Sequence, residues 1–161
     1  SMLVDFDALP DTARIWIYQA SRAFSPEEAD EIRLRLSAFL TEWTAHGSSL
    51  RAGFELPYNR FIVIGLDQNS QAASGCSIDA SVHFIQELER QFDIVLLDRM
   101  NVTYKQGDHI AYKPLDQFRK MAKDRAVSPK TVVFNNLVNN KYEYRQDWEV
   151  PASESWHKRF F

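Results

Sequence analysis

Cysteine is almost missing from this 161-residue chain, which has a single one, Cys76. One thiol excludes an intramolecular disulfide. With only four scattered histidines it also excludes a zinc site of the CxxC type, so we expect no metal. A chain without disulfides is typical of a reducing compartment, and we therefore expect a cytoplasmic protein.

Long apolar runs and a strong net charge are missing as well. No apolar stretch approaches the roughly 20 residues that a membrane-spanning helix needs, so we expect no membrane partner. The net charge of −3 argues against attraction of the whole chain to nucleic acid. A composition that is 45% hydrophobic and 25% charged is that of an ordinary soluble globular protein, and the length fits a single domain over residues 2–161.

The pattern of apolar residues predicts both strands and helices. Ser25, Pro26 and Glu28 form a helix start, with an N-cap, a proline at the first helical position and a capping box. Gly47 is expected to end that helix. The predicted strands cover residues 14–19, 50–56, 60–67 and 98–105, and a second helix follows Ser77 as far as Phe92.

The order of these elements, β-α-β-β-α-β, predicts an α+β fold of the ferredoxin-like kind over residues 2–106. Such a core has an antiparallel four-stranded sheet with two helices on one face. Residues 107–161 are predicted to add a helix over 115–125, a strand over 131–134 and an aromatic tail. We expect the tail to pack on the core. The alternative is that the tail covers a partner subunit, as in a homodimer.

The small polar loop over residues 69–79 is the candidate binding site. It joins a buried strand to an amphipathic helix, and the free amides at a helix start attract anions and reactive groups. We expect Ser74, Gly75 and Ser77 to contact a ligand or cofactor there. The loop matches no motif that identifies the ligand, so the cofactor stays unknown.

Cys76 is the candidate nucleophile of the same loop. It stands next to Ser77, the expected N-cap, where helix amides favour the thiolate. His46 or His83 would supply the base. The alternative, favoured by the usual behaviour of unpaired cysteines, is an inert buried side chain at a helix–strand junction.

The other histidines offer weaker candidates. Asp79, His83 and Glu87 recur every four residues and share one helical stripe, which would suit proton transfer or a divalent ion. That stripe lies opposite the apolar face, so a solvated helix surface is the favoured interpretation. His109 and His157 have no partner that the spacing assigns, and we expect both to be structural.

Basic residues concentrate over residues 113–130. A basic helix face could contact phosphate, with Tyr104 or Tyr112 stacking a base of single-stranded nucleic acid. No RNP-type string of glycine and aromatic residues is present. A charged, solvent-exposed helix is therefore the favoured interpretation, and nucleic acid is not the partner that we expect.

Several strings carry a resemblance to a known family. They are RIWIYQ at 14–19, YNRFI at 58–62, ASGCSIDASVHFIQ at 73–86, TVVFNNLV at 131–138 and WEVPASESWH at 148–157. Over nearly its whole length the chain resembles a family of short, uncharacterised bacterial proteins often labelled "ABC transporter ATPase". The resemblance implies no activity and no site residues.

The label in that family name fails on the residues of this chain. An ATPase of this class needs Gly-x-x-x-x-Gly-Lys-[Ser/Thr], whose amides and lysine hold the phosphates. None of the five glycines is followed by a lysine, and an LSGGQ-type signature is missing too. We therefore expect no ATPase activity.

Three functions stay open on these residues. The leading hypothesis is a module that binds a small ligand or a protein partner without catalysis. The first alternative is a small enzyme or thiol-dependent protein centred on Cys76, with Asp79 and a histidine as helpers. The second is binding of single-stranded nucleic acid through residues 113–130.

Overall fold

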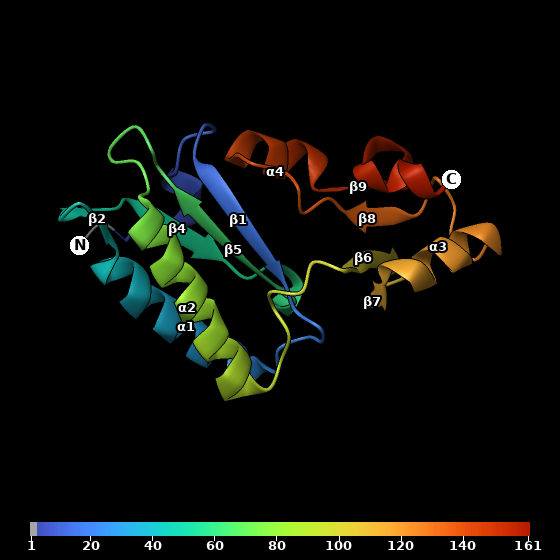
Figure 1. Ribbon diagram of the computed structural model, residues 1–161, viewed down its shortest axis with the longest axis horizontal. Helices are drawn as coiled ribbons and strands as arrows, with labels where there is room; N and C mark the ends of the chain where they lie inside the picture. Colours follow the sequence, from blue (N-terminus) through green and yellow to red (C-terminus); the bar gives the residue numbers. More distant parts are fainter. Residues whose placement is uncertain (1–2) are drawn as a thin grey trace. The chain divides into compact units, whose positions relative to one another are not determined.

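The computed structural model describes residues 3–161 and divides them into two compact units (Figure 1). Unit 1 holds the chain up to Leu97 together with Asn139–Tyr142, and unit 2 holds Asp98–Val138 and Glu143–Phe161. Each unit has its own hydrophobic core. Four α-helices and antiparallel sheets confirm the predicted α+β class. Within residues 3–161, no helix combines the length and the apolar character that spanning a bilayer requires.

Unit 1 is a three-stranded antiparallel sheet with two long helices on one face (Figure 1). Every residue of the central strand is buried. The strands, in their spatial order, are β1 (Arg14–Gln19), β5 (Phe61–Leu66) and β4 (Ala52–Glu55), and the helices are α1 (Pro26–Glu42) and α2 (Gly75–Phe92). The predicted strand over 14–19 and the hairpin of β4 and β5 are confirmed.

A later segment of the chain completes unit 1 at the edge of β1. The amide of Ile15 donates to the carbonyl of Asn139 at 2.9 Å. The buried ammonium group of Lys141 donates to the carbonyls of Asp7 at 3.0 Å and Leu9 at 2.7 Å. Residues 139–142 therefore belong to this unit through backbone pairing and through a lysine that satisfies one buried and one partly buried carbonyl.

The predicted start of α1 is confirmed in detail. The Ser25 hydroxyl accepts from the Glu28 amide at 3.1 Å, and the Glu28 carboxylate accepts from the Ser25 amide at 2.9 Å. The same carboxylate also accepts hydrogen bonds from two guanidinium nitrogens of Arg22, at 2.8 and 3.0 Å. The Arg22 hydrogen bonds, with the Ser25 amide, lower the pKa of Glu28 to about 2.

α1 ends at Glu42, five residues before the glycine that was expected to end it. The chain then forms a short hairpin of β2 (Thr44–Ala45) and β3 (Ser48–Ser49). His46 and Gly47 are its two turn residues, with φ of 51° and 78°. A two-residue turn with both φ values positive suits glycine, and histidine tolerates it better than most side chains.

Unit 2 is a four-stranded antiparallel sheet with short helices around it. The strands, in their spatial order, are β7 (His109–Pro114), β6 (Asn101–Gln106), β8 (Val132–Phe134) and β9 (Glu149–Pro151). The helices are α3 (Leu115–Lys123), α4 (Lys141–Asp147), which begins in unit 1, and the 3-10 helices η3 (Ala152–Glu154) and η4 (Trp156–Phe160). α3 and β8 confirm the predicted helix over 115–125 and the predicted strand over 131–134, whereas β9 was not predicted.

Aromatic residues of the C-terminal segment pack inside unit 2. The ring of the buried Phe118 lies 5.3 Å from Tyr104 and 5.4 Å from Phe160, between ring centres. The ring centres of Trp148 and Phe134 are 4.9 Å apart. The tail is thus a packed part of this unit, as its apolar content requires.

The complete ferredoxin-like order predicted for residues 2–106 is not confirmed, because the sheet of unit 1 has three of the four predicted strands. In that order a helix connects two strands that run parallel in one sheet. β1 and β4, which α1 connects, do run parallel, because each pairs antiparallel with β5 between them. The fourth predicted strand, β6, pairs in the sheet of unit 2 and not in the sheet of unit 1.

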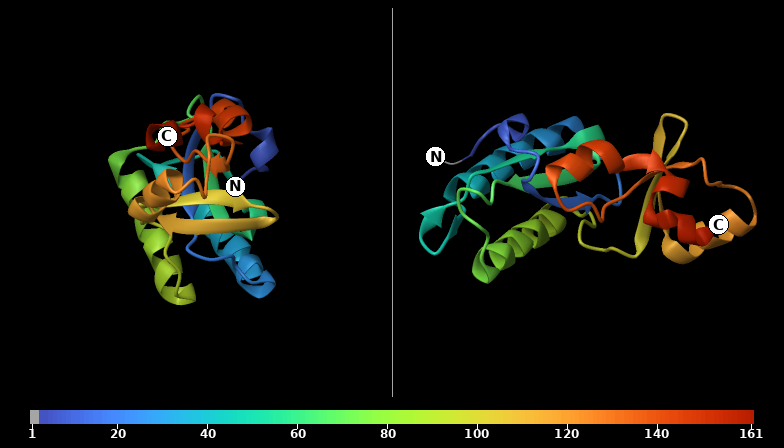
Figure 2. Two further views of the ribbon diagram at one scale, coloured as in Figure 1. Left: turned by 90° about the vertical axis from the view of Figure 1, so that its right-hand side faces the viewer. Right: turned by 90° about the horizontal axis from the view of Figure 1, so that it is seen from above.

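β6 finds its partner in the segment that follows it directly, which the sequence analysis does not recognise as a strand. Figure 2 shows β6 and β7 as two arms of one hairpin. Gln106 pairs with His109 around a turn in which Gly107 has a φ of +64°. Closing this short loop costs less chain entropy than pairing with a distant strand, and this favours β7 as the partner of β6.

The division between the units lies at Leu97, before β6 begins. Ile94 and Leu96 are buried in the core of unit 1. The carboxylate of Glu89 accepts hydrogen bonds from the amides of Leu96 and Leu97, at 2.8 and 3.1 Å. These contacts fix the end of unit 1, so the core does not extend through β6 as the sequence analysis predicts.

Candidate functional site

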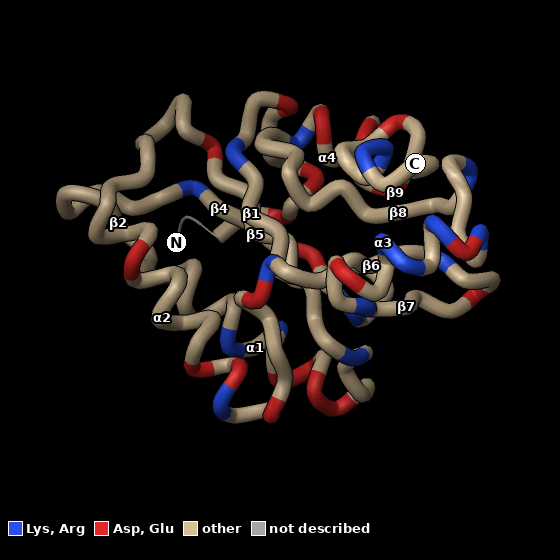
Figure 3. The backbone as a smooth tube through the Cα atoms, turned by 45° about the vertical axis from the view of Figure 1, so that its right-hand side comes forward, with Lys and Arg blue, Asp and Glu red and all other residues tan. Residues whose placement is uncertain are grey.

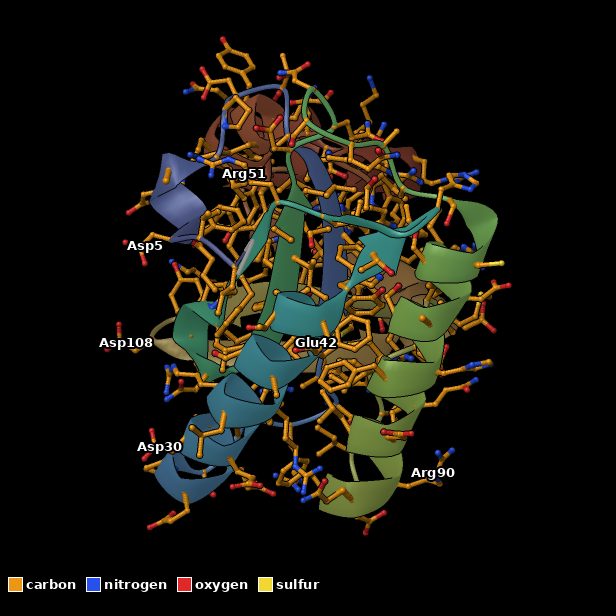
Figure 4. All side chains as sticks on the ribbon, turned by 90° about the vertical axis from the view of Figure 1, so that its left-hand side faces the viewer. Asp5, Asp30, Glu42, Arg51, Arg90 and Asp108 are labelled. Atoms are coloured by element: carbon orange, nitrogen blue, oxygen red, sulfur yellow. The ribbon has the colours of Figure 1, made fainter. Side chains whose placement is uncertain are left out.

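A pocket opens in unit 1 where the end of α1 meets the start of α2. The two helices run in opposite directions, as Figure 4 shows: Asp30 and Arg90 lie toward one end of the pair and Glu42 lies at the other. The pocket has a volume of about 410 Å³. Its walls are Phe39, Glu42, Trp43, Thr44, His46, Ser74, Cys76, Ser77 and Ala80.

Trp43 forms the fixed apolar wall of this pocket. The indole Nε1 donates to the carbonyl of Ser77 at 2.8 Å, which ties the residue after α1 to the first turn of α2. The Trp43 ring also packs edge-to-face with Trp16, with ring centres 6.0 Å apart, and at a tilt of 38° against Phe39, 5.8 Å away. A buried indole with its hydrogen bond made and two ring neighbours has little freedom to move, so the wall is preformed.

The first turn of α2 supplies the polar side of the pocket. Ser74, and not Ser77, is the N-cap, because the two serines form a reciprocal capping box. The Ser74 amide donates to the Ser77 hydroxyl at 2.8 Å, and the Ser77 amide donates to the Ser74 hydroxyl at 3.1 Å. This places Cys76 inside the first turn, where its amide and that of Gly75 have no partner within the helix.

The structure brings some of the predicted site residues together and leaves others apart. Ser74, Cys76 and Ser77 line the pocket, and Gly75 is exposed beside them. The Cys76 side chain is exposed and not buried as in the inert alternative. Asp79 and His83 lie exposed on α2 and are not among the residues that line the pocket.

His46 is the histidine that shares this pocket with Cys76. It reaches the pocket from the turn between β2 and β3, where its positive φ holds the backbone. Both His46 and Cys76 are exposed. Of the two histidines proposed as the base, His46 lines the pocket with Cys76 and His83 does not. The hairpin that follows α1 brings His46 there.

Sequence reasoning missed the residues that the end of α1 contributes. Phe39, Glu42, Trp43 and Thr44 line the pocket, and all four lie outside the loop over residues 69–79 in which the site was predicted. The signal that could have found them is spatial. Two antiparallel helices of similar length place the last turn of one beside the first turn of the other.

The described residues offer no metal centre and no unsatisfied polar group as a second site. Across residues 3–161, no group of three or more histidine, cysteine, aspartate or glutamate side chains is placed to hold a metal ion. Asp79, His83 and Glu87 on α2 therefore do not form such a group either. Every buried side-chain nitrogen or oxygen in the same range has a hydrogen-bond partner.

His157 and His109 lie in unit 2 in very different surroundings. His157 is 1% exposed, stacks on Trp156 at 3.9 Å between ring centres, and has Nδ1 2.7 Å from the Ser155 hydroxyl. Burial lowers its pKa to about 4. His109 is exposed in the β6–β7 hairpin.

Comparison of the chain with family models, with curated proteins and with solved structures finds no match. The resemblance to the family labelled "ABC transporter ATPase" therefore stays a prediction.

Proposed function

We propose that this protein binds a small organic ligand in the pocket between the end of α1 and the start of α2. The observation that carries the proposal is the pocket itself, which combines a rigid aromatic wall with a polar helix start. A volume of about 410 Å³ lies within the range of pockets that bind small molecules in other proteins.

The lining residues favour a ligand with one flat apolar part and one polar part. Phe39 and Trp43 offer an apolar surface that needs no rearrangement. Thr44, Ser74 and Cys76 offer hydroxyl, thiol and amide groups on the other side. An aromatic acid or amide matches both sides at once.

The test uses benzoate, indole-3-acetate and nicotinamide as probes, followed by two-dimensional ¹⁵N NMR of the full chain. At millimolar concentration we expect shifts of the amides of Ser74 and Cys76 and of the indole signal of Trp43. Ala80→Phe places a ring in the pocket and should abolish these shifts. Ala38→Phe is the matched control, because Ala38 is an exposed alanine of α1 that does not line the pocket.

Two outcomes would contradict the proposal. One is that none of the three probes shifts the pocket signals of the wild-type chain. The other is that Ala80→Phe leaves the shifts unchanged, which would place binding elsewhere.

A second candidate function, thiol-dependent chemistry, is favoured by one specific observation: Cys76 and His46 line the same pocket. In this function His46 would accept the thiol proton, the thiolate would add to a carbonyl carbon of the bound molecule, and the carbonyl oxygen would take up the electron pair of the C=O π bond and the proton from His46. We expect Cys76 to react with iodoacetamide at neutral pH faster than free cysteine does, and His46→Asn to remove that excess. A rate no higher than that of free cysteine would exclude this function and leave the binding proposal standing.

A further inference from the structure

The surface of unit 2 around α3 carries cations that have no carboxylate partner. We call this set the basic surface; its members are the exposed side chains Lys120, Lys123, Arg125, Lys130, Lys158 and Arg159. None of them forms an ion pair within the described part of the chain, residues 3–161. Arg119 beside them differs, because it contacts Asp116 at 3.0 Å.

Three segments that are separate in the sequence build this surface. η4 packs on α3, since the Phe118 ring lies 5.4 Å from Phe160 and 6.4 Å from Phe161. The loop before β8 is held against η3, which directly precedes η4, because the Ser153 amide donates to the carbonyl of Pro129 at 2.9 Å. Figure 3 shows lysine and arginine, in blue, gathered along α3 and on neighbouring turns.

The charge of this surface exceeds what its own acidic groups can balance. Asp124 and Glu154 lie in the same segments, and Asp116 is already engaged by Arg119. Six unpaired cations over two short helices and a loop repel one another, and a polyanion would relieve that repulsion. The net charge of −3 conceals this, because the excess of acidic residues lies elsewhere in the chain.

An exposed aromatic ring beside these cations indicates which class of polyanion would bind. Phe161 is 45% exposed and its ring lies perpendicular to Phe118, with ring centres 6.4 Å apart, so the ring has a neighbour in the unit and is still reachable from solvent. Arg119 lies over the neighbouring Phe160 ring at 5.6 Å. Cations beside an available ring are the combination that holds single-stranded nucleic acid, through phosphates and through base stacking. A duplex would offer its phosphates but no free base face.

We infer that the basic surface binds single-stranded nucleic acid without sequence preference, with Phe161 stacking on one base. The sequence alone favours a solvent-exposed helix over residues 113–130, because no RNP-type string is present. Lys158, Arg159 and Phe161 join that segment only in the folded unit. The inference does not depend on the pocket of unit 1, so each can fail without the other.

The test measures fluorescence anisotropy of a labelled oligouridine of about 16 nucleotides with the full chain. Between about 50 and 200 mM KCl, four to six phosphate contacts predict a slope of log K against log salt of about −3 to −4. Lys120→Gln/Lys123→Gln should reduce the slope by about 1.4 and weaken binding about tenfold. Arg33→Gln/Arg90→Gln, which removes the same charge from exposed positions of α1 and α2, should leave both unchanged.

A third variant tests the ring separately from the charge. Phe161→Ala should weaken binding about fivefold or more while the salt slope stays the same. The inference is overturned by no binding at 50 mM KCl, by equal losses in the two double variants, or by full affinity in Phe161→Ala. Tighter binding to a duplex of equal length, or to phosphatidylserine vesicles, overturns it as well.

Discussion

Lowering the pH below 6.5 should destabilise unit 2 through one buried side chain, His157. The imidazole is 1% exposed and lies between Trp156 and Phe118, with ring centres 3.9 and 6.1 Å away. The Ser155 hydroxyl lies within hydrogen-bond distance of the imidazole, 2.7 Å from Nδ1. With a hydroxyl and two rings around it, an imidazolium there would lose its hydration without gaining a counter-charge, so burial lowers the pKa to about 4.

The direction of the effect follows from which state binds the proton first. The unfolded chain protonates this histidine near its ordinary pKa of 6.5, and the folded unit only near 4. Stability is therefore complete above pH 6.5 and is lost progressively as the pH falls toward 4. Each unit of pKa difference corresponds to about 1.4 kcal/mol, so the full loss amounts to about 3 kcal/mol.

Urea unfolding at several pH values across this window measures the loss. His157→Asn, which keeps a polar atom near the position of Nδ1, should lower stability at neutral pH through lost ring packing but remove the dependence between pH 6.5 and 4. His109→Asn is the control, because His109 is exposed in the same unit, and it should keep the wild-type profile. If the ring of His157 titrates near pH 6.5 by NMR, or if His157→Asn retains the full slope, the reasoning fails.

Three further changes test contacts in unit 1. Lys141→Met leaves the buried carbonyl of Leu9 and the partly buried carbonyl of Asp7 without their donor and should cost about 2 kcal/mol in urea unfolding; a loss within error would contradict this. Gly53→Ala places a Cβ 2.6 Å from the backbone oxygen of Val4 and should cost about 2 kcal/mol or displace the N-terminal segment, visible as amide shifts at Val4. Glu28→Gln should cost about 1 kcal/mol. It should also remove a loss of stability that the wild type shows as the pH falls from 4.5 toward 2, since the folded carboxyl has the lower pKa; an unchanged acid profile would refute the role of its arginine pair.

Local signals in the sequence predicted local structure well. The box of Ser25 and Glu28 fixed the start of α1, and the apolar strand over 14–19 was confirmed to the residue. Both depend on side chains within a few positions of each other. The start of α2 was placed three residues late because its box uses Ser74 and Ser77, and serine at the third helical position is a weaker signal than glutamate.

Strand pairing could not be predicted in the same way, because it is decided by competition among partners. β6 has the alternating pattern that would suit a fourth strand in either sheet. The turn at Gly107 gives it a neighbour six residues long at almost no entropic cost, and the interior of β6 is buried in unit 2 as a result. An alternating pattern can thus predict a strand correctly without indicating the sheet in which that strand pairs.

The candidate pocket shows the same division between local and spatial information. The sequence predicted a polar helix start with Cys76 in it, since capping residues and small side chains are visible locally. It could not show that Trp43 would reach the Ser77 carbonyl and close the apolar side, because 34 residues separate the two. That one hydrogen bond joins the end of α1 to the start of α2 and makes the difference between an exposed loop and a walled pocket. Trp43→Phe keeps most of the ring but removes the donor, so any ligand that depends on the wall should bind more weakly to that variant than to the wild type.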